Sequence, residues 1–140
     1  MKGSTHFGWL AAALFFIGCS MEPRSLVYVF PDNFHGIFKA RADPNGVPVR
    51  PQSTTITLSI PPSGVLLVKG ELPNRRWYST SARFVSGKVI PISEPAHPLS
   101  KDELALRSVG SKAAYEDWFV VGTYSDAAKA QEQLRGFKWP

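Results

Sequence analysis

Hydrophobic and polar residues alternate along much of the chain, which is typical of strands whose two faces meet different surroundings. The clearest case is 54–60, where Ile56, Leu58 and Ile60 lie on one face and hydroxyl side chains lie on the other. This pattern favours an antiparallel sheet with one solvated side. Further segments rich in β-branched and aromatic residues, bounded by Pro, Gly or Asn, are also predicted as strands: 25–30, 36–43, 65–70, 77–85 and 117–124.

Two segments depart from the strand pattern. Residues 93–112 are polar and contain proline, which predicts a long loop with a helical turn within 101–107. In 126–135, small and apolar residues recur at spacings of three and four, which predicts a helix with a narrow apolar stripe. Ser125 is the predicted N-cap and Gly136 the predicted stop. The predicted fold is mainly β: a small antiparallel β-sandwich with one C-terminal α-helix.

Residues 1–18 have the order of a secretory signal, with one lysine near the start, an apolar stretch and the small residue Gly18 at the end. The apolar stretch holds about a dozen residues, whereas a membrane span needs roughly 20. Residues 16–19 resemble the bacterial lipobox, although Phe16 stands where leucine is usual. In that motif a signal peptidase cuts before the cysteine, which then carries diacylglycerol and usually a third acyl chain. Cys19 is therefore the predicted lipidation site.

Lipidation would divide the chain into a signal peptide over 1–18, a tether over 19–24 and one β-rich domain over 25–140. Two or three acyl chains hold a domain stably on a bilayer, whereas one chain is marginal. Ser20, rather than Asp, follows the cysteine, which under the lipoprotein sorting rule permits export to the outer membrane of a Gram-negative cell. The alternative is that Cys19 is an ordinary apolar residue in a secretory peptide cut nearby or in an uncleaved anchor.

The composition adds charge and the lack of disulfides to this description. Removal of residues 1–18 takes away one lysine and no acid, so 15 basic and 11 acidic side chains remain. A mild positive excess favours anionic lipid head groups or acidic glycans as partners, and it is equally typical of a mixed, solvated surface. Cys19 is the only cysteine, so no disulfide forms within the chain and stability depends on packing.

One segment, 74–84, has the composition of a ligand-binding strip. It combines Arg75 and Arg76 with Trp77 and further aromatic residues, which suits stacking and anion binding. Because an exported domain rarely meets nucleic acid, the expected ligand of a functional strip is a carbohydrate or an anionic envelope polymer. The alternative is an ordinary strand whose aromatic residues belong to the core and whose arginines are solvated.

The sequence contains few residues in patterns typical of catalytic or metal-binding sites. His35 and His97 are the only histidines after the predicted signal, and neither belongs to a spaced metal or zincin motif. Ser63 lacks the glycine-flanked elbow of a hydrolase nucleophile. We predict no catalytic residue, no metal site and no cofactor. A small hydrolase or metal-dependent enzyme that uses His35 or His97 remains the alternative.

Several short landmarks resemble those of a small family of bacterial extracytoplasmic domains, often found behind lipoprotein signals, whose activity is uncharacterised. They are VFPDNFHG (29–36), GVP (46–48), IPPSGVL (60–66), Trp77 and FVVGT (119–123). Asn33 occupies the place where the family pattern has its first glycine, and Asn tolerates the left-handed conformation that such a turn needs. The resemblance implies a compact β-sandwich-like domain and supplies no catalytic residues.

These observations predict a membrane-tethered lipoprotein of the bacterial envelope. The bilayer, reached through acylated Cys19, is one expected partner, and an anionic envelope polymer or an envelope protein is another. The expected role is that of a non-enzymatic structural or binding module.

Overall fold

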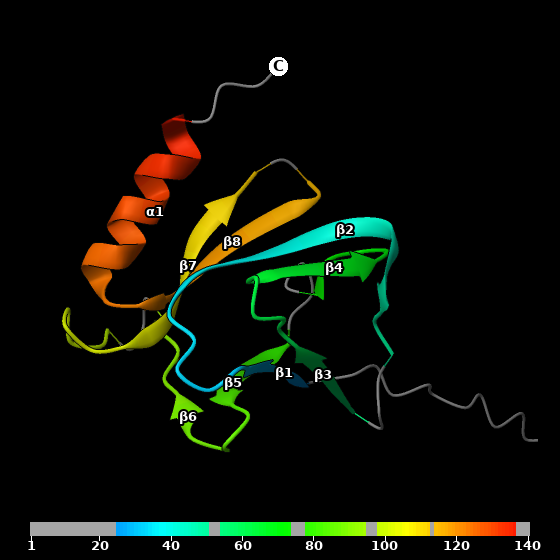
Figure 1. Ribbon diagram of the computed structural model, residues 1–140, viewed down its shortest axis with the longest axis horizontal. Helices are drawn as coiled ribbons and strands as arrows, with labels where there is room; N and C mark the ends of the chain where they lie inside the picture. Colours follow the sequence, from blue (N-terminus) through cyan, green and yellow to red (C-terminus); the bar gives the residue numbers. More distant parts are fainter. Residues whose placement is uncertain (1–24, 51–53, 74–77, 95–97, 113, 137–140) are drawn as a thin grey trace, which may run out of the picture.

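Two four-stranded sheets face each other, and a helix covers part of the outer face of the second sheet (Figure 1). The computed structural model describes residues 25–50, 54–73, 78–94, 98–112 and 114–136. The first sheet has the order β3-β1-β5-β6 and contains β1 (Ser25–Phe30), β3 (Thr55–Ser59), β5 (Ser79–Phe84) and β6 (Val89–Ile90). The second has the order β4-β2-β8-β7 and contains β2 (Gly36–Pro48), β4 (Val65–Lys69), β7 (Ala105–Ser111) and β8 (Glu116–Gly122). The helix is α1 (Tyr124–Gly136).

A mainly β fold with a C-terminal helix is therefore confirmed, but the prediction of purely antiparallel sheets is wrong. Strand β1 runs parallel to both β3 and β5, and β2 runs parallel to β4. The chain passes to the opposite sheet after each of its first four strands, so successive strands of one sheet run in the same direction. The alternation in 54–60 correctly predicted a strand with one buried and one exposed face. A strand of this kind can pair with a neighbour in either direction, so the pattern does not determine whether the pairing is parallel.

The core lies between the sheets and is dominated by aromatic rings. Tyr28 and Phe30 project from β1 toward Phe38 of β2 and Phe119 of β8. The rings of Phe38 and Phe119 are stacked, with centroids 5.3 Å apart. Aliphatic residues from both sheets surround them, including Leu26, Ile56, Leu58, Leu66, Val68, Ile90, Leu106 and Val121. Burial of this apolar surface is the main stabilising contribution available to a chain without disulfides.

Helix α1 begins before the predicted N-cap. Thr123, not Ser125, occupies the cap position: its hydroxyl accepts a hydrogen bond from the Asp126 amide, while Asp126 Oδ2 accepts one from the Thr123 amide at 2.9 Å. This reciprocal pair is a capping box with Asp as its acidic member. The predicted apolar stripe is confirmed, because Ala130, with Ala127 and Leu134 beside it, packs against the outer face of β7 and β8.

The predicted long loop over 93–112 and its helical turn are wrong in their second half, which forms β7. Leu106 enters the core between the sheets and Val109 packs on the helix side, but a register irregularity between Ser108 and Gly110 interrupts the alternation. Of the two polar residues between them, Ser108 is exposed but Arg107 is buried. Because a buried arginine and a bulge both break the alternation of apolar and polar residues, hydrophobic periodicity does not predict this strand.

Strand β2 is longer than the predicted 36–43, because it continues through the segment expected to form turns. Its pairing with β4 shifts between Ala42 and Val47 and then resumes to Pro48. A Cβ atom on Gly46 would lie 2.6 Å from the backbone of Val68, so only glycine allows the two strands this close at the irregularity.

The parallel strands give the sandwich two distinct ends. At one end, here called the Ser25 end, β1, β3 and β5 begin with Ser25 beside Thr55 and Ser79. At the other, the Phe30 end, they finish, and the loop after β1, the β5–β6 hairpin and the start of α1 all lie there. In the described ranges no helix is long and apolar enough to cross a bilayer.

Candidate functional site

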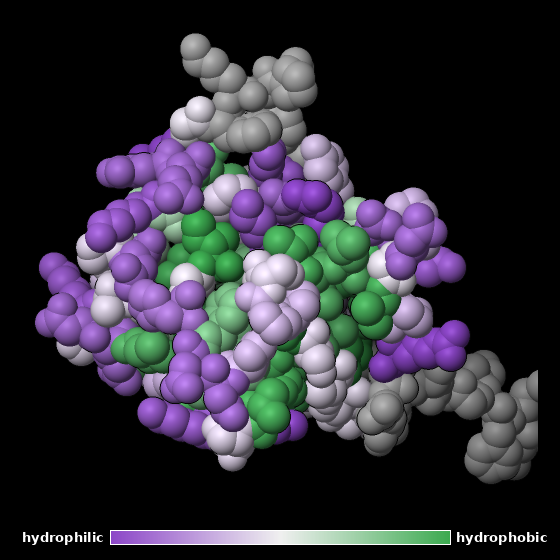
Figure 2. Space-filling view, in the orientation of Figure 1, coloured by the Kyte–Doolittle hydropathy of each residue, from purple (hydrophilic) through white to green (hydrophobic). Residues whose placement is uncertain are grey.

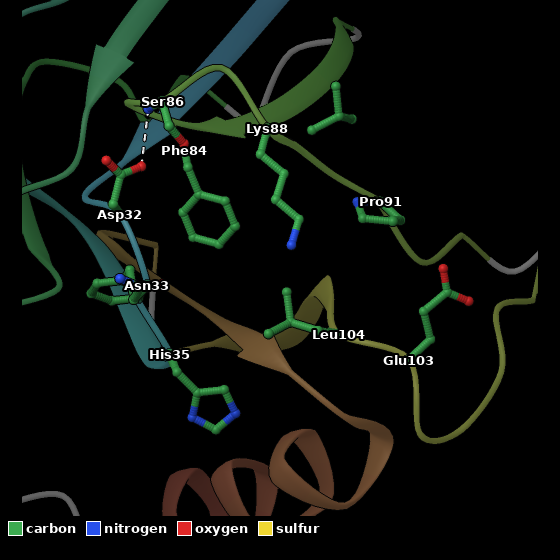
Figure 3. Close-up of a pocket in the computed structure, with 11 residues that line it drawn as sticks. Asp32, Asn33, His35, Phe84, Ser86, Lys88, Pro91, Glu103 and Leu104 are labelled. Carbon is green, nitrogen blue, oxygen red and sulfur yellow. Dashed lines mark hydrogen bonds between the residues drawn. The ribbon is translucent and has the colours of Figure 1, made fainter.

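A groove of about 790 Å³ opens at the Phe30 end, between three segments that are distant in sequence (Figure 3). They are the loop 32–35 after β1, the hairpin between β5 and β6, and the residues that precede β7. The lining residues are Asp32, Asn33, Phe34, His35, Phe84, Ser86, Lys88, Val89, Pro91, Glu103 and Leu104. This recess combines apolar surface with polar groups from all three segments, and it is the candidate functional site.

The first wall of the groove is fixed by a tight turn. The Phe34 amide donates to the Pro31 carbonyl, and Asn33 has a positive φ of 61°. Asp32 accepts a hydrogen bond from the Ser86 amide at 2.9 Å, which ties this turn to the β5–β6 hairpin. Hydrogen bonds from the Ser86 side chain and backbone lower the pKa of Asp32 below its usual value. The carboxylate therefore stays charged and continues to hold the two segments together.

His35 stands at the boundary between the groove and helix α1. Its Nε2 lies 3.3 Å from Asp126 Oδ2, an oxygen that also accepts hydrogen bonds from the backbone and hydroxyl of Thr123. Those hydrogen bonds from Thr123 lower the pKa of Asp126. The same carboxylate oxygen therefore serves as the acceptor of the helix cap. In Figure 3, His35 and the Asp32–Ser86 pair lie on separate parts of the groove wall. The geometry therefore provides a histidine–carboxylate contact, and within the described ranges no serine is hydrogen-bonded to that histidine.

The rest of the groove combines apolar surface with charges of both signs. Phe34 and Phe84 contribute aromatic surface, and Val89, which is 70% exposed, stands at the mouth. Lys88 points into the groove, and Glu103 projects from the opposite segment (Figure 3). On the face drawn in Figure 2, hydrophobic patches likewise lie among hydrophilic side chains. Such a lining suits a ligand that presents both apolar and polar groups.

A buried arginine holds the third wall in place. Arg107 donates from Nε to the Gly122 carbonyl at 3.3 Å, and from one terminal nitrogen to Ser93 Oγ at 3.0 Å. The other terminal nitrogen donates to the carbonyls of Ser100 and Glu103, at 3.0 and 3.1 Å. One guanidinium thus joins the segment before β7 to the end of β8, and so places Glu103 at the groove.

Most of the predicted site residues lie outside the described ranges: Cys19, His97, Arg75, Arg76 and Trp77. The described part of the strip 74–84 follows the alternative interpretation. Phe84 is buried in the core, Tyr78 packs against it, and Arg83 is exposed.

The sequence also missed most of the groove. Asp32 and Asn33 lie in a segment that the sequence predicts as a turn. Lys88, Glu103 and Leu104 belong to no sequence motif that indicates a binding site. Their convergence depends on the order of the strands, which no local pattern reports. Among the residues that the structure places, no group of three or more His, Cys, Asp or Glu side chains is arranged to hold a metal ion.

In comparisons with known proteins, no family model, no curated protein and no solved structure matches this chain. The functional conclusion therefore depends on the residues and their arrangement.

Proposed function

We propose that this protein is a lipid-anchored, extracytoplasmic lipoprotein of the bacterial envelope. In this proposal, acylated Cys19 tethers a non-enzymatic binding module, and the groove at the Phe30 end takes an extended segment of an envelope protein. The observation that carries the proposal is the position of the groove. It lies at the Phe30 end of the sandwich, whereas the predicted tether leads into β1 at the Ser25 end.

The polarity of β1 supports this arrangement. Ser25 begins β1 six positions after Cys19, and β1 has six residues. At about 3.3 Å per residue, the strand carries the chain roughly 20 Å from its first residue to the groove. A bilayer-attached Cys19 would therefore leave the Phe30 end directed away from its own membrane, where a partner can reach it.

The chemistry of the groove favours a protein segment over an anionic polymer. Asp32 and Glu103 both contribute carboxylates, which would repel a polyanion, whereas Lys88 and the apolar residues suit a mixed peptide. Strand β6 lies at the edge of its sheet, and residues on both sides of it line the groove. An extended peptide can add to such an edge while its side chains enter the recess.

The rival function, a hydrolase or metal-dependent enzyme built on His35 or His97, has less support. A serine hydrolase needs a base within hydrogen-bond reach of its nucleophile. Nε2 of His35 instead lies against the carboxylate of Asp126, which already caps the helix. An envelope binding module needs no such arrangement.

The anchor is tested by the mass of the N-terminal peptide. The full-length protein, with a C-terminal tag, is produced in a lipoprotein-processing bacterium and recovered from membranes, alongside a Cys19→Ala variant. We expect an N-terminal Cys19 carrying two or three acyl chains in the parent and an unmodified, unanchored product in the variant. An uncut chain with a free Cys19 thiol would refute the lipoprotein proposal.

The groove is tested by site-specific photo-crosslinking in intact cells. A crosslinker at Val89 is expected to give a discrete protein adduct that Leu104→Asp abolishes, because a carboxylate there opposes apolar docking. The matched control places the crosslinker at Val47, which is 54% exposed and does not line the groove. The same adducts from both positions, or an adduct unaffected by Leu104→Asp, would contradict the assignment of this groove.

A further inference from the structure

A second recess, of about 500 Å³, lies between the segments that precede β7 and the start of α1. We call it the Arg107 recess. Residues from 93–94, from 98–101, from β7 and from the first turn of α1 line it, and none of them lines the groove at the Phe30 end. The Tyr124 amide donates to the Lys101 carbonyl at 2.9 Å, so the backbone itself holds the two sides of the recess together (Figure 1).

The recess contains a buried cation that lacks a negative partner. Arg107 lines the recess and is 6% exposed, and in the described segments its acceptors are one hydroxyl and three carbonyls. A guanidinium has five N–H donors, so these four hydrogen bonds leave one N–H without an acceptor among the described residues. That N–H belongs to the nitrogen that donates to Ser93, which also lines the recess. An anion that reaches this nitrogen would neutralise a charge that is only weakly screened by water.

Lys101 supplies a second cation to the same recess. Its ammonium lies 6.0 Å from the centroid of the Tyr124 ring, at the outer limit of a cation–π contact, and within the described ranges no carboxylate forms an ion pair with it. Glu94 also lines the recess and supplies a negative charge. Two cations and one carboxylate favour a ligand with a single negative charge over a polyanion.

The remaining surface of the recess is largely apolar. Pro98 and Leu99 contribute from the segment before β7, and Tyr124 and Ala127 contribute from α1. Tyr124 is 57% exposed, so a ligand can contact its ring. A cavity of about 150 Å³ accepts one benzene ring, and the recess at about 500 Å³ therefore has room for a ring with a short acidic side chain.

We propose that the Arg107 recess binds a small organic monocarboxylate with an apolar body. The unpaired N–H of Arg107 and the ammonium of Lys101 donate to the carboxylate oxygens, and the apolar body lies between Leu99 and Tyr124. Glu94 disfavours ligands that carry a second negative charge. This site is independent of the groove and of the lipid anchor, and it adds a small-molecule ligand to the proposed peptide-binding function.

The test compares phenylacetate with phenylacetamide, which has nearly the same shape but no charge. The isotope-labelled full-length protein is titrated with each compound in detergent solution and followed by amide and arginine Nε–H NMR. With millimolar phenylacetate we expect saturable shift changes at the amides of Leu99, Lys101 and Tyr124 and at Nε–H of Arg107. The affinity for phenylacetamide should be about tenfold lower, because charge-assisted hydrogen bonds are lost.

A charge reversal tests the site without disturbing Arg107. Lys101→Glu changes an exposed side chain, and the hydrogen bond from Tyr124 remains because it goes to the backbone carbonyl. The variant should weaken phenylacetate binding about tenfold, since an attraction is replaced by a repulsion, and should leave phenylacetamide binding unchanged. Lys69→Glu, at an exposed position of β4 outside the recess, is the matched control.

Three results would overturn the proposal: no saturable shift changes with phenylacetate, equal affinity for phenylacetate and phenylacetamide, or unchanged phenylacetate affinity in the Lys101→Glu variant. Inorganic phosphate is titrated in the same way. If phosphate shifts the same signals with an affinity equal to or higher than that of phenylacetate, the recess binds oxyanions without using its apolar surface, and the proposal is overturned as well.

Discussion

The two ends of the second sheet contain buried charge, but the charge is balanced in different ways. At the Ser25 end, the carboxylate of Glu116 accepts from Arg41 Nε at 2.6 Å and from Trp118 Nε1 at 2.5 Å. Toward the Phe30 end, the Arg107 guanidinium contacts one hydroxyl and three carbonyls, and in the described segments no carboxylate contacts it. One charge is paired with an opposite charge, and the other is surrounded by neutral acceptors.

The two groups of residues, here called the Glu116 cluster and the Arg107 cluster, also hold different parts of the fold together. Arg41 and Glu116 are direct partners in the β2–β8 register, so their ion pair joins strands that are already hydrogen-bonded. Arg107 holds a segment between β6 and β7 that has little regular structure of its own, and it does so through backbone carbonyls. We infer that the Glu116 cluster stabilises the sheet, whereas the Arg107 cluster shapes the third wall of the groove.

The largest effect is expected when Arg107 is replaced by Met. The variant leaves the Gly122, Ser100 and Glu103 carbonyls without their donor, and we expect a loss of about 3 kcal/mol in the free energy of unfolding. Urea unfolding measures the loss, and amide hydrogen exchange should show faster exchange over 100–104. Arg83→Met, at an exposed arginine of β5, is the control. An equal loss in both variants would mean that the hydrogen bonds of Arg107 are unimportant.

A smaller effect, about 2 kcal/mol at neutral pH, is expected for Arg41→Met, because the Arg41 side chain is 44% exposed and that of Glu116 is only 2% exposed. Burial alone would raise the pKa of Glu116. Hydrogen bonds from Trp118 and Arg41, with the charges of Arg41 and Lys112, outweigh burial and hold that pKa below its usual value.

This balance predicts how the effect of Arg41→Met changes with pH. In the parent, the depressed pKa of Glu116 contributes stability above the unfolded-state pKa, and this contribution is lost as pH falls through the folded-state value. The difference between parent and variant should therefore shrink as the pH falls, as measured by urea unfolding across the acidic range. In a Glu116→Gln background the trend should disappear. A difference that stays constant with pH would contradict the role of Glu116.

The helix cap at the Phe30 end gives a third test. Asp126→Ala removes the acceptor of the Thr123 amide and is expected to cost about 1 kcal/mol. Hydrogen bonds from the Thr123 backbone and side chain lower the pKa of Asp126, so its contribution should be lost as pH falls through that lowered value. Thermal unfolding followed by circular dichroism measures the effect, with Asp102→Ala at an exposed turn as the control. Similar thermal midpoints for the two variants would exclude a capping contribution.

The smallest effect concerns Lys39, whose ammonium lies 3.9 Å from the centroid of the Trp118 ring. Lys39→Met keeps the apolar stem and removes the cation–π contact, so we expect a loss of about 0.5 kcal/mol. Combined with Arg41→Met, the loss should be non-additive, because both cations act on the Glu116–Trp118 pair. Lys69→Met, at an exposed position of β4, is the control. Strict additivity in urea unfolding would separate Lys39 from the cluster.

By itself, the sequence determined which segments are strands wherever the alternation was clear, and it located the C-terminal helix. Residues 25–30 and 65–70 match β1 and β4 closely, because β-branched and aromatic residues between turn formers leave few alternatives. The turn at Asn33 was also readable, since the left-handed conformation restricts the residue type. The predicted lipidation motif at Cys19 is likewise a local pattern of the sequence.

Only the tertiary structure decided how the strands are ordered, which cation is buried and where the recesses lie. Strand direction follows from the alternating passage of the chain between sheets, a long-range feature that local hydrophobicity does not encode. Arg107 looked like an ordinary polar residue of a loop, yet its acceptors come from Gly122 and from residues before β7. Likewise, the Tyr28 hydroxyl lacks a hydrogen-bond partner among the described residues as a result of packing between the two sheets, because whether a buried polar group finds a partner depends on residues remote in sequence.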